Sequence, residues 1–171
     1  MEQVIIYASK GGRAQAVAEK IAAQQAGALF SYKDLPALGK DQEVIYVGSI
    51  YAGQILGLEK VANKLAQVAG VTLVTVGMMD PSLPETAKLR QEAIAKAQSK
   101  GAFTLQAHVP LQGTLHVEKL SFPQRTLIKA MYKQGKKNPQ GELGAIVAAV
   151  DNPTSFDWAQ VDRLLATFTA N

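Results

Sequence analysis

Residues 4–21 read VIIYASKGGRAQAVAEKI, which is an apolar run, a turn with two adjacent glycines and an alanine-rich segment of helical periodicity. This order predicts a buried strand, a tight turn and the N-terminus of a helix. The first N–H groups of a helix lack partners within the helix, and the helix dipole adds positive potential there. Ser9, Lys10 and Arg13 place a hydroxyl group and two cations in the turn. We therefore expect it to bind one phosphate-sized anion.

The turn matches neither of two common nucleotide-binding patterns. It contains no G-x-x-x-x-G-K-[ST] phosphate loop and no G-x-G-x-x-G dinucleotide fingerprint. A hydroxyl group, flexible glycines and a helix start suit a phosphate monoester instead. The alternative is an ordinary strand-to-helix turn in which Gly11 and Gly12 only provide positive φ angles.

Apolar runs that alternate with amphipathic segments indicate an α/β fold. Continuous runs such as VTLVTV, residues 71–76, are typical of central parallel strands that are covered on both faces. The amphipathic segments between these runs predict crossover helices. The first has its apolar stripe at Ile55, Leu58, Ala62 and Leu65. The second has its apolar stripe at Ala87, Ile94 and Ala97, and we expect its charged residues Lys88, Arg90, Glu92 and Lys96 to point outward. The candidate strands are residues 4–8, 28–32, 44–48, 71–77, 103–109 and 146–150.

Composition excludes several classes of protein and site. The 171 residues suit one domain, and we expect residues 1–171 to fold as a single unit. The chain has no cysteine, which excludes disulfides and thiolate chemistry, and with only His108 and His116 we expect no metal site. No apolar run reaches the roughly 18 residues of a membrane span. No signal-peptide pattern opens the sequence, so we expect a cytoplasmic protein.

A second loop of interest follows the third apolar run and reads GSIYAGQ, residues 48–54. In an open parallel sheet, ligands bind beyond the carboxyl ends of the strands. Tyr51 is suited to stacking on a planar ring there, and Gly53 permits close approach of the backbone. The alternative is that Tyr51 only covers the edge of the core.

Together these loops resemble those of the flavodoxin family. Residues 9–13 (SKGGR) follow the first strand, and residues 48–53 (GSIYAG) follow the third. Later motifs are similar to the branch of flavodoxin-domain proteins that includes menaquinone-dependent protoporphyrinogen oxidase, and the similarity extends over essentially the whole chain. These motifs are LQGTL (111–115), LSF (120–122), IKAM (128–131) and FDW (156–158). The resemblance implies a flavodoxin-like three-layer sandwich, with a five-stranded parallel sheet of order 2-1-3-4-5 and helices on both faces.

The resemblance also implies FMN as the cofactor. In this family the first loop binds the FMN phosphate, and the second loop and a third one, here GMMDP at residues 77–81, flank the flavin ring. The flavin itself transfers the electrons or hydride, so no catalytic side chain is implied. The implied contacts are Ser9, Lys10, Gly11, Gly12, Arg13 and Ala14 in the first loop, Ser49, Ile50, Tyr51, Ala52 and Gly53 in the second, and Gly77, Met78 and Met79 in the third.

Two departures from the family pattern affect this expectation. The family's phosphate loop carries a hydroxyl residue at the position of Ala14, so one hydrogen bond worth about 1.5–3 kcal/mol is missing. Lys10 or Arg13 can replace it with an ion pair to the phosphate. The pI near 9.3 also differs from that of acidic electron-carrier flavodoxins, and argues against an ordinary shuttle that is partnered with basic reductases.

The basic character is concentrated between Lys119 and Lys137, which hold six cations and no acidic residue. Arg125, Lys129 and Lys133 recur every four residues and form a cationic stripe on a predicted helix. The stripe suits peripheral contact with the anionic inner face of a membrane. The alternative is a covering helix that packs on the sheet and leaves its lysines in water. We expect no nucleic-acid binding, because interleaved aromatic residues are missing.

Two functional hypotheses follow. In the first, the chain is an FMN-dependent redox protein whose partner is a redox protein or a quinone-type small molecule. Quinone-linked oxidation of a porphyrinogen is the activity that the resemblance suggests. In the second, it is a binding or membrane-associated regulatory protein that keeps the fold and has lost FMN.

Overall fold

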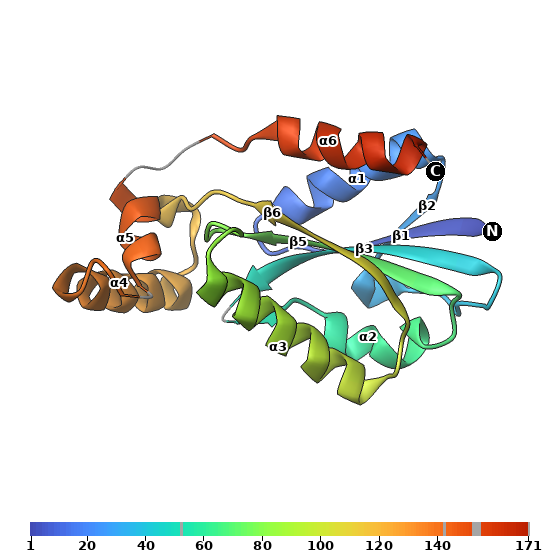
Figure 1. Cartoon of the computed structure of the whole chain (residues 1–171), viewed down its shortest axis with the longest axis horizontal. Coiled ribbons are helices and arrows are strands. Elements are labelled where there is room, and N and C mark those ends of the chain that lie inside the picture. The colour runs from blue at the N-terminus through green and yellow to red at the C-terminus, as the bar shows by residue number, and fades with distance from the viewer. Residues whose placement is uncertain (52, 142, 152–154, 171) are drawn as a thin grey trace.

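Five parallel strands form the centre of the computed structural model, which describes residues 1–51, 53–141, 143–151 and 155–170 (Figure 1). They run in the order β2-β1-β3-β5-β6, which confirms the predicted order 2-1-3-4-5. A sixth strand, β4 (Gln54–Ile55), pairs antiparallel with β3 and was not expected. The parallel strands are β1 (Glu2–Ala8), β2 (Ala28–Ser31), β3 (Gln42–Tyr51), β5 (Gly70–Gly77) and β6 (Leu105–Gln112).

Helices cover both faces of this sheet (Figure 1). Because successive strand residues point to opposite faces, Ile5 packs in one core and its neighbour Ile6 in the other. This two-sided burial explains why the strands read as continuous apolar runs. The helices α1 (Arg13–Gln25) and α6 (Trp158–Thr169) cover the face of Ile5, whereas α2 (Leu58–Leu65) and α3 (Pro84–Lys100) cover the face of Ile6. Short 3-10 turns lie at Tyr32–Asp34 and Val117–Lys119.

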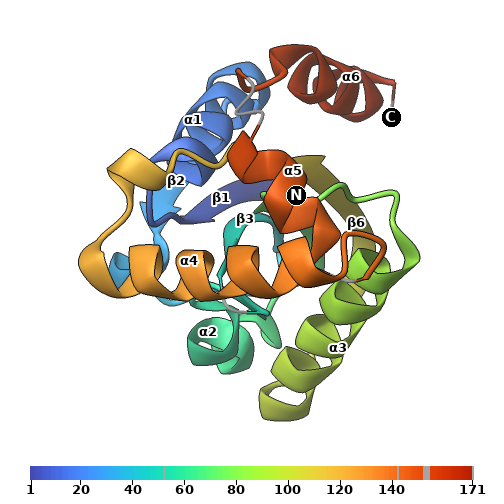
Figure 2. The ribbon, with the colours of Figure 1, turned by 90° about the vertical axis from the view of Figure 1, so that its left-hand side faces the viewer.

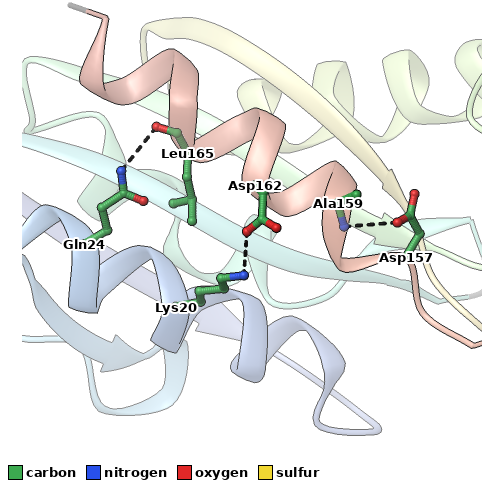
Figure 3. Close-up of polar contacts among 6 residues, drawn as sticks. All are labelled: Lys20, Gln24, Asp157, Ala159, Asp162 and Leu165. Atoms are coloured by element: carbon green, nitrogen blue, oxygen red, sulfur yellow. Dashed lines mark hydrogen bonds and ion pairs between the residues drawn. The ribbon is translucent and has the colours of Figure 1, made fainter.

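The C-terminal helix α6 is joined to α1 by polar contacts (Figure 3). The carboxylate of Asp157 accepts a hydrogen bond from the N–H of Ala159 at 3.0 Å and caps the helix. Lys20 on α1 pairs with Asp162 at 2.6 Å. These contacts fix α6 beside α1. The aromatic pair of Phe156 and Trp158, at the start of α6, lies near Arg13 at the end of the first loop.

Two further helices, α4 (Phe122–Lys137) and α5 (Gly144–Asp151), lie beyond the carboxyl ends of the strands (Figures 1 and 2). They enclose a third small core of Leu115, Ile128 and Ile146. The helices approach closely at Gly135, where a Cβ atom would lie 2.5 Å from the carbonyl oxygen of Leu143. The edge of the sheet where ligands of such folds bind is therefore roofed by α4 and α5.

Two sequence predictions are wrong. Residues 146–150, predicted as a strand, lie in α5, because a short continuous apolar run does not distinguish a strand from a helix. Arg90, predicted to point outward, is only 8% exposed.

Candidate functional site

The first loop joins β1 to α1 and leaves the start of the helix open. Gly12 occupies the N-cap position with a φ of 91°, a left-handed conformation that favours glycine. The hydroxyl oxygen of Ser9 accepts a hydrogen bond from the N–H of Gly12 at 2.9 Å, which closes the turn. No side chain caps α1, and its first turn contains no acidic residue. The uncapped N–H groups of α1 are thus free to bind an anion.

Two cations border this loop, and both are held by aromatic rings. The Lys10 ammonium lies 4.2 Å from the centre of the Tyr51 ring, within the range of a cation–π contact. The Arg13 guanidinium lies 4.4 Å from the Phe156 ring and 5.7 Å from the Trp158 ring. Among the described residues, neither cation forms an ion pair with a carboxylate. The loop therefore has positive potential that no neighbouring acid neutralises.

The remaining predicted residues of the first two loops differ in what they can contribute. The side chain of Ala14 is fully buried in the core beneath α1, so only its N–H can reach a ligand. The carbonyl of Ser49 accepts the N–H of Leu56 at 2.9 Å, and Ser49 does not line the cavity described next. Gly11 is exposed in the turn. Ala52 lies outside the described residues.

An apolar cavity of about 190 Å³ separates the second loop from the third. The predicted site residues that line it are Ile50, Tyr51 and Gly53 on one side and Gly77, Met78 and Met79 on the other. Gly53 has a φ of 74° and has open space where a Cβ atom would stand. Because Lys10 rests on the Tyr51 ring, the first loop adjoins a wall of this cavity. The two predicted parts of the site are thus contiguous.

One face of α4 forms the roof of the cavity. Gln124, Leu127, Ile128 and Met131 have helical i, i+3, i+4 and i+7 spacing and all line it. For this helix we gave packing on the sheet as the alternative to contact with a membrane. In the structure this face covers the strand ends, together with Ile146 of α5.

The third loop is held by its own polar groups. The Asp80 carboxylate accepts hydrogen bonds from the N–H of Ser82 at 2.9 Å and from its hydroxyl at 2.7 Å. These bonds lower the pKa of Asp80. The carbonyl of Gly77 accepts the N–H of Gly113 at 2.5 Å, which joins the loop to the end of β6. The backbone that faces Tyr51 across the cavity is therefore well supported.

A half-buried histidine and a buried threonine lie beside the cavity. The Thr75 hydroxyl, which lines the cavity, is 3.0 Å from the Nε2 atom of His108 on β6. Burial, followed by the charge of Arg90, lowers the pKa of His108 to about 4. The imidazole is therefore neutral at pH 7.

Arg90 and Thr86 are cavity residues that sequence reasoning missed. Both are on α3 and both are more than nine-tenths buried, at 8% and 7% exposure. One Nη atom of Arg90 donates to the carbonyl of Pro81 at 3.0 Å. The Nε atom of Arg90 and the hydroxyl of Thr86 have no hydrogen-bond partner among the described residues. Each such buried group costs about 1–3 kcal/mol.

The signal that could have placed Arg90 was its spacing. Thr86, Arg90, Ile94 and Ala97 recur at intervals of three or four residues, which puts all of them on the buried face of α3. The charge of Arg90 instead predicted an outward-facing side chain. The site offers an anion-binding turn beside an apolar slot for a planar group, and two buried polar groups at the slot have no partner among the described residues.

A comparison with protein families matches residues 4–142 to the family described as "Flavodoxin domain". No curated protein matches the sequence. Similar solved structures include a Trp repressor binding protein from Bacillus subtilis, with 12% identity, a TM-score of 0.46, and coverage of 66% of this chain and 84% of the other. An archaeal flavodoxin has 16% identity, a TM-score of 0.44, and coverage of 67% and 86%. Oxidised flavodoxin 1 from Bacillus cereus has 16% identity, a TM-score of 0.44, and coverage of 70% and 89%. Similarity at this level carries no functional argument, so the family assignment depends on the sequence match.

Proposed function

This chain belongs to the flavodoxin domain family, and we propose that it is a redox protein that binds FMN across the first loop and the adjoining cavity. The observation that carries the proposal is the contact between Lys10 and Tyr51, which joins the anion-binding turn to the wall of the apolar slot. FMN has a phosphate and a planar ring at its two ends. The site presents the complementary chemistry in two adjacent places.

The residues of the site fit this cofactor. The uncapped start of α1 and the cations Lys10 and Arg13 suit a phosphate dianion, and they compensate for the hydroxyl that Ala14 lacks. A cavity of about 190 Å³ is below the roughly 300–1,000 Å³ of pockets that enclose a whole ligand. The slot is therefore sized for one part of FMN, the ring, while the phosphate remains at the open turn.

Bound FMN would supply the electron or hydride transfer, and the protein supplies binding, orientation and the exclusion of water. Ser9, Lys10, Gly12 and Arg13 would hold the phosphate. Tyr51, Met78 and Met79 would flank the ring, and the roof of α4 would keep water from it. His108 is neutral and bonded to Thr75, so we assign no acid or base to the site.

The direct test is a titration of FMN fluorescence with the purified protein. We expect quenching that saturates at one FMN per chain. An Arg13→Met variant keeps the apolar contact with Phe156 but loses the charge, and we expect it to bind FMN at least tenfold more weakly, a loss of about 1.4 kcal/mol. No quenching by the unaltered chain would favour the alternative, a protein of this fold that has lost FMN.

We further propose that the electron acceptor is a quinone-type small molecule, in a quinone-linked oxidation similar to that of menaquinone-dependent protoporphyrinogen oxidase. The apolar lining of the cavity and its position at the carboxyl ends of the strands support an apolar partner. The test mixes the reduced, FMN-loaded protein anaerobically with a water-soluble quinone. We expect re-oxidation faster than that of free reduced FMN at the same concentration. An equal rate would contradict the proposal.

We also propose that the outer face of α4 contacts an anionic membrane surface. Figure 2 shows α4 lying across one end of the molecule. Phe122 is 82% exposed, and its spacing from the exposed Lys129 and Lys133 places all three on the side opposite the cavity roof. Arg125 differs from these lysines, because its guanidinium donates to the carbonyls of Glu118 and Leu120. In the part of the chain that the structure describes, no helix could cross a membrane.

This membrane proposal is tested by co-sedimentation with vesicles that contain phosphatidylserine. We expect the bound fraction to fall sharply when Lys129 and Lys133 are both replaced by Glu, and to fall with rising salt. A double Glu variant of Lys88 and Lys60, which are exposed on α3 and α2, changes the net charge equally and is the control. Equal loss in both variants would show a general charge effect and contradict a docking face on α4.

A further inference from the structure

Arg90 is a buried cation at a mainly apolar cavity. Its guanidinium donates to the carbonyl of Pro81, and no ion pair with a carboxylate is formed within the described ranges. A guanidinium stays charged under all ordinary conditions, so burial is costly unless an acceptor completes its hydrogen bonds. Burial lowers the pKa of Arg90. Such a group calls for a ligand that carries acceptor atoms.

The polar side chains around the cavity have different partners. The Thr75 hydroxyl is engaged with His108, Lys10 covers the Tyr51 ring, and the side-chain oxygen of Gln124 accepts the N–H of Ser121. In contrast, the Nε atom of Arg90 and the hydroxyl of Thr86 are buried without a partner in the described residues. They stand one helical turn apart on α3, and both line the cavity. Both side chains therefore border the slot and carry a polar atom that has no partner among the described residues.

We propose that Arg90 and Thr86 form the polar anchor of the ring-binding slot, and that the charge of Arg90 makes the slot prefer a ring that carries negative charge. The inference rests on the proposed function and deepens it, because it assigns two residues outside the three loops to the flavin ring. The ring presents carbonyl oxygens and ring nitrogens as acceptors, and its reduced form can be anionic. Arg90 and Thr86 would then favour binding of the reduced form over the oxidised one.

The ring-only ligand lumiflavin, which has no phosphate, separates this anchor from the first loop. We expect Arg90→Met to weaken binding of both lumiflavin and FMN at least tenfold. Lys88→Met removes a cation from the exposed side of the same helix and should change neither affinity. Arg13→Met should weaken FMN and leave lumiflavin unchanged. These pairs of variants and ligands distinguish loss of the ring anchor from loss of the phosphate site.

The redox preference supplies the second measurement. At a pH at which reduced lumiflavin is anionic, we expect the unaltered chain to bind the reduced ring at least tenfold more tightly than the oxidised ring. Arg90→Met should abolish this preference, whereas Arg90→Lys keeps the charge and should retain most of it even where overall affinity falls. A merely structural role for Arg90 would weaken both redox forms equally.

The proposed anchor is overturned if the unaltered chain and Arg90→Met bind lumiflavin with equal affinity. It is also overturned if Arg90→Met loses the same affinity for the reduced and the oxidised ring. If FMN still binds the unaltered chain in those cases, the proposed function stands without it. If the unaltered chain binds neither ligand, the proposed function and the anchor are both overturned. Circular dichroism of each variant verifies that it is folded before its affinity is measured.

Discussion

The ammonium group of Lys10 lies 4.2 Å from the centre of the Tyr51 ring and joins the loop after β1 to the loop after β3. These two strands are neighbours in the sheet, so their carboxyl ends bring the loops together. The contact places a cation at the boundary between the anion-binding turn and the apolar cavity. Tyr51 is thereby oriented by the same loop that we propose to hold the phosphate.

Replacement of Tyr51 tests whether its ring contributes to FMN binding. We expect Tyr51→Leu to weaken FMN about two- to tenfold, because an aromatic stacking contact is worth about 0.5–1.5 kcal/mol. Tyr51→Phe keeps the ring and should bind FMN as the unaltered chain does. Fluorescence titration measures both affinities. A Tyr51→Phe variant that is weakened as much as Tyr51→Leu would contradict a stacking role for the ring.

Gly12 and Gly11 form a matched pair for testing the first turn. Gly12 has a φ of 91°, whereas Gly11 does not adopt a positive φ, and a Cβ atom at either position meets nothing. We expect Gly12→Ala to lower the free energy of unfolding by about 1–2 kcal/mol, the cost of a left-handed conformation for a residue with a Cβ. Gly11→Ala should have little effect. Urea denaturation compares the two, and equal losses would contradict the turn geometry.

His108 predicts a specific dependence of stability on pH. Burial and the charge of Arg90 lower the pKa of the folded imidazole to about 4, against 6.5 when it is unperturbed. Between these values the unfolded chain binds a proton at His108 that the folded chain does not, so stability falls as pH falls through this window. We expect a loss of about 1–2 kcal/mol, less than the full shift implies, because solvent screens a half-buried group.

The measurement for this prediction is the free energy of unfolding at several pH values for the unaltered chain and for His108→Gln. Other titrating groups are the same in both proteins, so the difference between the two curves isolates His108. The unaltered chain should lose stability toward acid more steeply than the variant. Parallel curves would mean that His108 is not buried as a neutral group.

Tyr46 offers a test of the core beneath the second loop. Its side chain is fully buried, and its hydroxyl donates to the carbonyl of Leu56 at 2.7 Å. Burial raises the pKa of Tyr46, so the hydroxyl remains protonated in alkaline solution. We expect Tyr46→Phe to cost about 1–3 kcal/mol, because the buried carbonyl loses its partner. The control is Tyr7→Phe on β1, whose hydroxyl has no partner among the described residues and should cost little.

The sheet was predictable because its central strands β1, β3 and β5 are buried on both faces and read as apolar runs. The resemblance of the loops after β1 and β3 to one family then predicted the strand order and the three ligand-binding loops. The roof was not predictable in the same way. The run from Ile146 to Val150 reads as apolar in either a strand or a helix, and in the structure it lies in α5, which packs against Gly135 of α4.

The candidate site was predicted in its loops but not in its interior. Periodicity and turn chemistry locate loops at strand ends and indicated Tyr51, whereas Gly77 and Met78 were implied by the family resemblance; all three line the cavity. Arg90 and Thr86 lie on a helix face that the sequence pattern predicts to be buried, but the charge of Arg90 led to the prediction that it points outward. A charged residue at a buried position of a helix is a useful signal in a sequence, because burial of an unpaired charge is costly and therefore indicates a functional or structural role.

The most direct test of the account is a comparison of FMN with riboflavin, which has the same ring and sugar chain but no phosphate. If the first loop binds the phosphate while the adjoining cavity binds the ring, equilibrium titration will give one FMN per chain. Riboflavin will then bind at least tenfold more weakly, and inorganic phosphate will compete with FMN only. Equal affinities for the two flavins, or no binding of either, would contradict the account.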